Sequence, residues 1–314
     1  MPAVGLGLWK VPKAVCASTV TSAIRMGYRH LDSACDYGNE KEVGQGIKAA
    51  IDEGLVTREE LWVTSKLWNT YHRKEHVEAA CQRTLADLSL SYVDLYLVHF
   101  PIALKYVPPS VRYPPEWIYD PDAVAPKMEI DESVPFRETW EGMEQLASLG
   151  VCKNIGVCNV NTALLRDLLS YASIPPAVLQ MELHPYLQQP KLLRFCAENS
   201  IAVTGFSPLG AGSYVELGGA TMAESALNDA TVTRLAKAHG VSPAQLLLRW
   251  ALQRGISVVP KSSKPERLTQ NLALSGFELS DEQMAEMATL DRHHRYNDPG
   301  VFCESMGVFC PIYD

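Results

Sequence analysis

The sequence has no long apolar run and no block of like charges. No segment approaches the roughly 18 consecutive apolar residues that a membrane-spanning helix requires. Its 314 residues carry a formal net charge of −8 that is spread along the chain, whereas proteins that bind nucleic acid present a basic face. We therefore expect neither membrane insertion nor nucleic-acid binding.

Paired cysteine motifs are also lacking. The eight cysteines are scattered, and none forms a C-x-x-C pair of the kind that holds zinc or performs redox chemistry. A chain of this length buries a core large enough to fold without disulfides. We expect reduced thiols, no metal site, no secretory leader before the first motif and a cytoplasmic location. Cys303 and Cys310 are a weak candidate pair.

Short apolar runs alternate with longer segments of helical periodicity along the whole chain. Eight alternating units predict an α/β fold, the (β/α)₈ TIM barrel, with residues 1–314 as one domain and no linker dividing it. The predicted strands are Val4–Leu8, Tyr28–Asp32, Leu61–Lys66, Leu95–His99, Asn154–Val157, Ala177–Glu182, Ala202–Phe206 and Ser257–Pro260.

Helical spacing is clearest in five segments between these strands, Val15–Met26, His76–Leu85, Arg137–Leu149, Leu192–Glu198 and Pro243–Arg254. Ser242 before Pro243 predicts an N-cap followed by a proline in the first turn. Two long insertions interrupt the alternation, Ile102–Pro135 and Gly210–Asn228, and the tail from Asn297 has no clear period. Loops of this length in a compact domain usually carry function.

Four polar residues fall at or just after consecutive predicted strand ends. Asp32 ends the second strand and Tyr37 follows five residues later, Lys66 ends the third, and His99 ends the fourth. Active sites of such barrels lie at the carboxyl ends of the strands, so these side chains should converge. Each alone has a structural explanation, such as a loop cap or an ion-pair partner. Together they indicate a catalytic site.

The chemistry of this set is coherent for reducing a carbonyl group. A free tyrosine has a pKa near ~10, and a neighbouring ammonium is expected to lower the pKa of Tyr37. Asp32 would keep Lys66 charged and oriented. A neutral His99 could hold a carbonyl oxygen by a hydrogen bond. The set could then protonate that oxygen as it gains negative charge.

The sequence resembles the aldo-keto reductase family over nearly its whole length. The matching motifs are GYRHLDSA at 27–34 with YGNE at 37–40, TSKLW at 64–68, LVHFP at 97–101, GVCN at 156–159 and VPKSS at 259–263. The resemblance implies that Tyr37 is the general acid and that Asp32, Lys66 and His99 complete a tetrad. Runs such as HPYLQQPK at 184–191 and RYNDP at 295–299 resemble the D-xylose reductase subgroup more than plant aldose-6-phosphate reductases.

The resemblance also implies an extended NADPH across the barrel mouth, because no G-x-G-x-x-G is present for a Rossmann site. Asn159 and Gln180 would hold the nicotinamide carboxamide, together with Cys158 in place of the usual serine. Phe206 would stack on the nicotinamide ring in place of the usual tyrosine. The remaining implied cofactor residues are Ser207, Leu209, Gly210, Ser213, Glu216, Lys261, Ser262, Ser263, Arg267 and Asn271.

Two parts of this set bear on the choice of cofactor. Lys261 and Arg267, with the neighbouring serines, suit the 2′-phosphate of NADPH because cations form charge-assisted bonds with it. Glu216 resembles the glutamate with which xylose reductases contact the ribose hydroxyls of NADH. We therefore expect NADPH to be preferred, with measurable use of NADH.

The substrate implied by the resemblance is a small-molecule aldose or aldehyde, reduced to its alditol by hydride transfer. The implied substrate residues are Trp9, Asp36, Trp68, Phe100 and Asn297. Two departures affect this prediction. Gly300-Val301-Phe302 stands where the family usually has tryptophan, and we expect this sequence to lack the N-terminal hairpin that plugs the barrel in relatives.

Other functions remain open from the residues alone. An aldose-6-phosphate reductase or a broad aldehyde reductase would use the same site. A non-catalytic nucleotide-binding subunit is disfavoured by the intact tetrad. A Schiff-base aldolase using Lys66 is disfavoured because Asp32 would keep that amine protonated. Relatives are often dimers, so the resemblance implies a homodimer.

Overall fold

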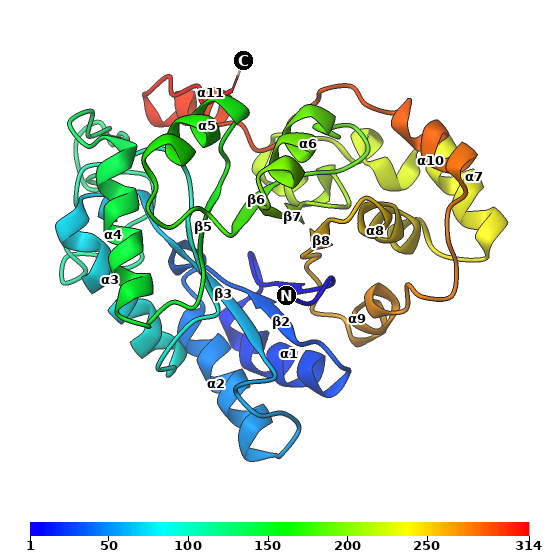
Figure 1. Cartoon of the computed structure of the whole chain (residues 1–314), viewed down its shortest axis with the longest axis horizontal. Coiled ribbons are helices and arrows are strands. Elements are labelled where there is room, and N and C mark those ends of the chain that lie inside the picture. The colour runs from blue at the N-terminus through cyan, green and yellow to red at the C-terminus, as the bar shows by residue number, and fades with distance from the viewer. Residues whose placement is uncertain (314) are drawn as a thin grey trace.

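The computed structural model describes residues 1–313, and in them eight parallel strands follow one another around a barrel (Figure 1). Each strand pairs with the next in chain order. The strands are β1 (Leu6–Gly7), β2 (His30–Asp32), β3 (Trp62–Leu67), β4 (Leu95–Val98), β5 (Ile155–Cys158), β6 (Val178–Glu182), β7 (Ala202–Phe206) and β8 (Ser257–Val258). All eight predicted strands are confirmed, and the (β/α)₈ class with them.

The barrel closes between its first and last strands. Val4 forms a parallel bridge with Val258, and Gly5 N donates to Val258 O at 2.8 Å. Gly7 allows this close approach, since a Cβ there would lie 2.4 Å from Val259 O. The first residues of the chain lie against the same strands, with Pro2 O accepting from Ser257 Oγ at 3.3 Å.

Helices surround the barrel and cover the outer face of the strands (Figure 1). They bury apolar stripes against the strands, as Leu246, Leu247 and Trp250 do. The helices are α1 (Lys13–Arg25), α2 (Glu40–Asp52), α3 (Lys74–Leu88), α4 (Phe136–Ser148), α5 (Thr162–Tyr171), α6 (Pro190–Glu198), α7 (Ala230–His239), α8 (Pro243–Gln253), α9 (Pro265–Leu272), α10 (Asp281–Ala288) and α11 (Pro299–Phe302).

The five predicted helices correspond to α1, α3, α4, α6 and α8. Ser242 caps α8 as predicted, and Gln245 completes a capping box with it. α7 and α10 lie beside each other outside the regular alternation (Figure 1). None of the helices in residues 1–313 is long and apolar enough to cross a membrane.

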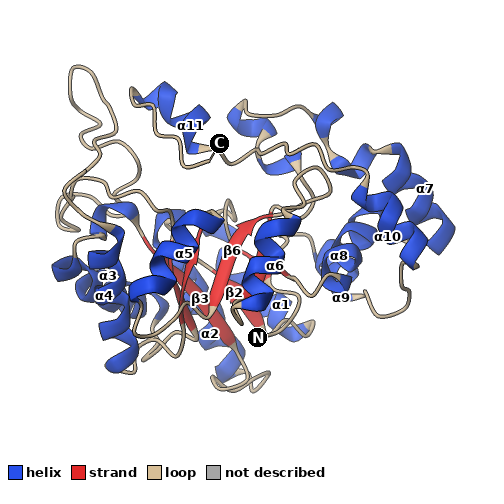
Figure 2. Ribbon diagram, turned by 45° about the horizontal axis from the view of Figure 1, so that its top comes forward, coloured by secondary structure: helices blue, strands red, loops and turns tan. Residues whose placement is uncertain are grey.

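The two insertions and the tail lie at one end of the barrel, where α11 stands beyond the strands (Figure 2). The first insertion, Ile102–Pro135, folds back on itself through a bridge between Leu104 and Ile130. The second, Gly210–Asn228, forms four short 3₁₀ turns. Met128 N donates to Met306 O at 2.9 Å, which joins the first insertion to the tail. All eight cysteines are buried and free, so Cys303 and Cys310 do not pair.

Candidate active site

Lys66 is the centre of the predicted tetrad. It is the last residue but one of β3 and is 1% exposed. Its ammonium donates to Asp32 Oδ1 at 2.7 Å, to Ser33 O at 2.8 Å and to Tyr37 Oη at 3.1 Å. These three acceptors use all three N–H groups of the ammonium. The side chain is therefore fixed as a charged donor.

The ionisation of this pair differs from the sequence prediction in one respect. Burial alone would lower the pKa of Lys66, but Asp32 and Tyr37 outweigh it and raise that pKa. Burial also raises the pKa of Tyr37 above its ordinary value, and the Lys66 charge only partly opposes it. Lys66 acts in the predicted direction and lowers the Tyr37 pKa, but the net pKa still lies above its ordinary value, because desolvation of the phenolate is the larger effect. Tyr37 consequently holds its proton at neutral pH.

His99 follows β4 and faces the same site. Its ring lies 5.9 Å from that of Tyr37 between centroids, in an edge arrangement. Burial, with the Lys66 charge and His72, holds the pKa of His99 well below its usual range. His99 is therefore neutral, as predicted. Its Nδ1 is buried and has no hydrogen-bond partner in residues 1–313.

The residues predicted for the nicotinamide lie on the neighbouring strands β5 and β6. Asn159 has a left-handed backbone (φ 58°) and donates from Nδ2 to His99 O at 2.8 Å. Its Oδ1 is buried without a partner in the described chain, which leaves an acceptor for a carboxamide N–H. Gln180 Nε2 donates to Asp32 Oδ2 at 2.5 Å, so Gln180 also orients the catalytic carboxylate. Cys158 is buried beside them, and burial raises the pKa of its thiol.

The predicted stacking residue Phe206 is the last residue of β7, immediately before the loop that follows the strand, and it is partly buried. Ser207 Oγ lies 2.8 Å from Tyr214 Oη. Lys10, which the sequence analysis did not identify, reaches this loop from the β1 side. Its ammonium donates to Ser213 O at 2.7 Å and lies 3.4 Å from Glu216 Oε2. Leu209 and Gly210 lie in the same loop.

The predicted phosphate residues gather at the start of α9. Lys261 and Ser263 are exposed in the loop before it, Ser262 is buried, and Arg267 is exposed in its first turns. Ser262 Oγ accepts from Lys264 N at 3.1 Å and shapes the turn that leads into the helix. This arrangement places cations and hydroxyls beside a helix N-terminus, which suits a phosphate dianion. Asn271 is buried further along the helix.

Aromatic rings wall the predicted substrate side. Trp68 is buried and lies edge-on to His99 at 5.3 Å between ring centroids, and Phe100 stacks on His99 at 5.1 Å. Trp117, from the first insertion, lies 5.0 Å from Trp68. Phe302 of α11 lies 5.3 Å from Trp117. Trp117 and Phe302 extend this aromatic wall and were not among the predicted substrate residues, although the aromatic content of the insertion was a signal for the first.

The three other predicted substrate residues are Trp9, Asp36 and Asn297. Trp9 is partly buried and packs on Tyr214 at 5.9 Å. Burial, with the nearby Glu116 carboxylate, raises the pKa of Asp36 to about 7. Asn297 is partly buried, and its backbone N donates to Glu182 Oε2 at 2.9 Å. The structure therefore brings the predicted substrate residues to the same end of the barrel as the tetrad.

Comparisons with known proteins agree with this geometry. The model of the Aldo/keto reductase family matches residues 3–292. The chain is 47% identical to a probable NAD(P)H-dependent D-xylose reductase of Aspergillus clavatus, over 100% of this chain and 96% of that protein. It is 49% identical to an NAD(P)H-dependent D-xylose reductase of Pyricularia oryzae, over 96% and 93%.

Solved structures show the same relationship. The aldo-keto reductase of Bombyx mori, solved in complex with NADP, has a TM-score of 0.83 and 36% identity, over 96% of this chain and 92% of that one. The aldose reductase of Schistosoma japonicum also gives a TM-score of 0.83 with 36% identity, over 94% and 90%. The chain belongs to the aldo/keto reductase family.

Proposed function

We propose that this enzyme uses NADPH to reduce an open-chain aldose of the xylose type to its alditol. The observation that carries the proposal is the Lys66 ammonium, which bonds Asp32 and Tyr37 at 2.7 and 3.1 Å at the mouth of the barrel. The likeness to D-xylose reductases along the full chain supports the substrate class.

The side chains divide the work of a carbonyl reduction. A nicotinamide cofactor held by these residues would supply the hydride for the carbonyl carbon. Tyr37 is protonated at neutral pH and donates its proton to the carbonyl oxygen as that oxygen gains charge. Lys66 stabilises the phenolate left behind, and Asp32 with Gln180 keeps Lys66 in place. Neutral His99 orients the carbonyl oxygen.

The residues present fit a nicotinamide dinucleotide. Asn159 has a buried Oδ1 for the carboxamide, with no partner among residues 1–313, and the Phe206 ring offers a stacking face. Lys261 and Arg267 would hold the 2′-phosphate, and Glu216 the ribose hydroxyls of NADH. The other residues proposed to hold the cofactor are Cys158, Gln180, Ser207, Leu209, Gly210, Ser213, Ser262, Ser263 and Asn271. We expect the specificity constant with NADPH to exceed that with NADH.

The geometry argues against the aldolase alternative. A Schiff-base lysine must attack as a neutral amine, whereas all three N–H groups of Lys66 are donated. Failure of borohydride to trap a sugar on Lys66 would agree with this. The intact tetrad likewise favours an enzyme over a nucleotide-binding subunit.

The direct test is a substrate panel of D-xylose, other aldoses, aldose 6-phosphates and simple aldehydes with NADPH and with NADH. We expect turnover of D-xylose with NADPH. A clear preference for aldose 6-phosphates would assign the chain to the sugar-phosphate reductases instead, and equal turnover of all aldehydes would make it a broad aldehyde reductase. No turnover of any aldehyde would reject an enzymatic role.

We also propose that the chain forms one barrel domain, acts in the cytoplasm and assembles as a homodimer. The dimer follows from the family resemblance and is checked by light scattering of the purified protein.

A further inference from the structure

Glu182, the last residue of β6, is a fully buried carboxylate that the proposed chemistry does not use. Its side chain is 0% exposed. Oε1 accepts from Tyr296 N and Oε2 accepts from Asn297 N, both at 2.9 Å. His184 Nε2 lies 2.8 Å from Oε1. The carboxylate thus joins the barrel to a segment 114 residues further along the chain.

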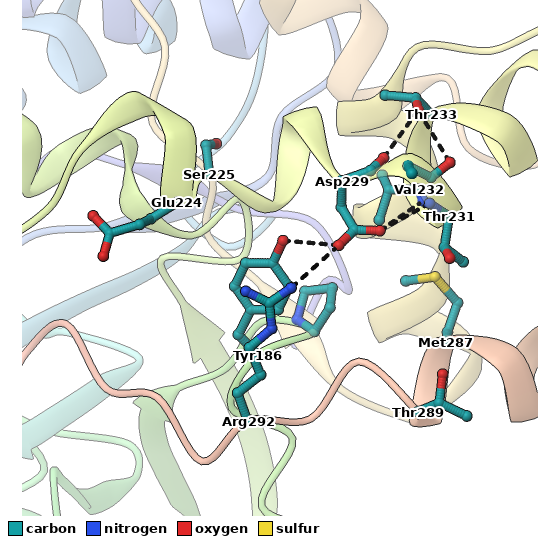
Figure 3. A network of polar contacts seen from close by, with 12 residues as sticks. Tyr186, Glu224, Ser225, Asp229, Thr231, Val232, Thr233, Met287, Thr289 and Arg292 are labelled. Atoms are coloured by element: carbon teal, nitrogen blue, oxygen red, sulfur yellow. Dashed lines mark hydrogen bonds and ion pairs between the residues drawn. The ribbon is translucent and has the colours of Figure 1, made fainter.

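The C-terminal segment has other attachments just before this point. Tyr186 O accepts from Arg292 N at 3.1 Å and from His294 N at 2.9 Å. The Tyr186 hydroxyl donates to Asp229 Oδ2 at 2.9 Å, and Arg292 reaches the same oxygen at 3.6 Å (Figure 3). Attachment of the segment therefore does not depend on Glu182 alone. Burying the Glu182 carboxylate costs desolvation free energy, and the other contacts already attach the segment. We therefore expect an effect of Glu182 on the residues that it bonds directly.

The two residues that Glu182 bonds, Tyr296 and Asn297, lie beside the aromatic wall on the predicted substrate side. The Tyr296 ring stacks on Tyr214 of the loop after β7 at 5.6 Å between centroids. Five residues beyond Asn297, Phe302 packs on Trp117 at 5.3 Å. Asn297 therefore lies between the contact with the cofactor loop and the contact with the aromatic wall.

The side chain of Asn297 is free, although its backbone is fixed. Its N–H is bonded to Glu182, but its side-chain amide has no hydrogen-bond partner in residues 1–313. Such an amide offers both a donor and an acceptor, and the chain of hydroxyls on an open-chain sugar needs both. Because the backbone of Asn297 is already fixed, less conformational entropy is lost when its side-chain amide binds a sugar hydroxyl.

We propose that Glu182 is a positioning residue for substrate selection, because it holds the Tyr296–Asn297 backbone so that the Asn297 amide meets the sugar hydroxyls. This inference rests on the proposed aldose reductase function. Glu182 does not touch the reacting atoms. It acts through Asn297, so its loss should weaken recognition of hydroxylated aldehydes and spare aldehydes that have no hydroxyl.

The test compares Glu182→Gln with wild type on D-xylose and on butyraldehyde, using NADPH. Glutamine keeps the size of the side chain, but its NH₂ cannot accept a hydrogen bond from a backbone N–H. We expect kcat/KM for D-xylose to fall at least tenfold, mainly through KM, and that for butyraldehyde to change less than twofold. Hydrogen exchange at the Tyr296 and Asn297 amides should speed up in the same variant.

Glu144→Gln is the matched control. Glu144 on α4 also accepts two backbone N–H groups, from Ser173 at 2.7 Å and Ile174 at 2.9 Å, but it contacts neither the tail nor the site. Its substitution should leave the D-xylose to butyraldehyde ratio and the Asn297 amide unchanged. In an Asn297→Ala background, Glu182→Gln should no longer change that ratio.

Three outcomes would overturn the inference. They are an equal loss on both substrates, unchanged exchange at the two amides, or a full additional effect of Glu182→Gln in the Asn297→Ala background. Failure of the proposed function is a different result, in which wild type itself reduces neither aldehyde with NADPH. The exchange measurement would still report whether Glu182 holds the segment.

Discussion

The catalytic and substrate-facing halves of the site are built differently. Asp32 and Lys66 stand on adjacent strands and are joined by hydrogen bonds between buried side chains, with Tyr37 just after β2. Trp117 and Asn297 stand on the first insertion and on the tail, and they are held by ring packing or backbone hydrogen bonds.

This difference teaches which part of the molecule sets each property. The barrel fixes the chemistry, since any shift of Lys66 would break three hydrogen bonds at once. On the proposed function, the insertion and tail set the shape and polarity of the substrate space, since they pack on each other and on the mouth of the barrel. Changes on the barrel side should therefore abolish reduction of every substrate, whereas changes on the loop side should alter the choice among substrates.

The largest effect is expected from Lys66→Met. It leaves Asp32 buried with its charge unpaired, which should lower the free energy of unfolding by about 3–5 kcal/mol. Reduction of all aldehydes should fall by roughly 10²-fold or more. Denaturant unfolding and NADPH oxidation measure the two effects. Lys153→Met is the control, because Asp94 retains Arg58 at 2.8 Å when Lys153 is removed. If both variants lost the same free energy of unfolding, the buried Lys66 would stabilise the fold no more than Lys153 does.

Arg267→Ala tests the cofactor side. Losing a charge-assisted bond of about 1.5–3 kcal/mol should weaken NADPH binding roughly 10- to 100-fold. NADH binding should change little, because NADH lacks the 2′-phosphate. Fluorescence titration of both cofactors measures this. Arg194→Ala on α6, where the side chain is 81% exposed, should change neither affinity. Equal weakening of NADPH and NADH would contradict the assignment.

Trp117→Ala tests the loop side. Removing this ring opens the wall formed with Trp68 and Phe302, so KM for D-xylose should rise roughly tenfold, corresponding to about 1.4 kcal/mol. Affinity for NADPH should stay the same. Tyr119→Ala, a more exposed ring on the same insertion, should have little effect on KM. An unchanged KM for D-xylose in Trp117→Ala would show that the Trp117 ring of the insertion does not contact the substrate.

The effect on activity is expected to be smallest at Glu40, which joins the two halves and whose replacement should change mainly the stability of the fold. This buried carboxyl accepts from Ser65 on β3 at 2.6 Å and from Tyr113 on the insertion at 3.4 Å. Burial raises the pKa of Glu40 to about 7. The folded state therefore keeps a proton that the unfolded state releases, and stability falls as pH rises from about 4.5 to 7.

Glu40→Gln cannot titrate and should escape this loss. Relative to wild type, its free energy of unfolding should improve by about 1–3 kcal/mol between pH 5 and pH 8. Urea unfolding at both pH values measures the difference. The exposed Glu53→Gln should show no comparable trend. If Glu40→Gln instead became less stable relative to wild type between pH 5 and pH 8, Glu40 would be charged in the folded state.

The barrel could be predicted from the sequence because its signals are local. Short apolar runs located all eight strands, and the Ser242-Pro243 pair located the start of α8. The strand-end rule then identified Asp32, Lys66 and His99 without any structure. The assignment of Tyr37 as the fourth member rested on a motif as well as on its place after β2.

The loops could not be predicted in the same way. The insertion at 102–135 is held by a bridge between Leu104 and Ile130 and by the packing of Trp117, and neither has a periodic signal. The net rise of the Tyr37 pKa was missed because desolvation of the phenolate depends on the packing around the hydroxyl, which the sequence does not show. The role of Glu182 could not be predicted from the sequence, because the backbone N–H groups that donate to it lie 114 and 115 residues further along the chain.

The most direct test of the account is the rate of D-xylose reduction by Tyr37→Phe with saturating NADPH. Phenylalanine keeps the ring but has no proton to donate, so we expect the rate to fall by roughly 10²- to 10⁴-fold while NADPH binds with its wild-type affinity. A Tyr37→Phe enzyme that reduced D-xylose at the wild-type rate would contradict the assignment of Tyr37 as the proton donor.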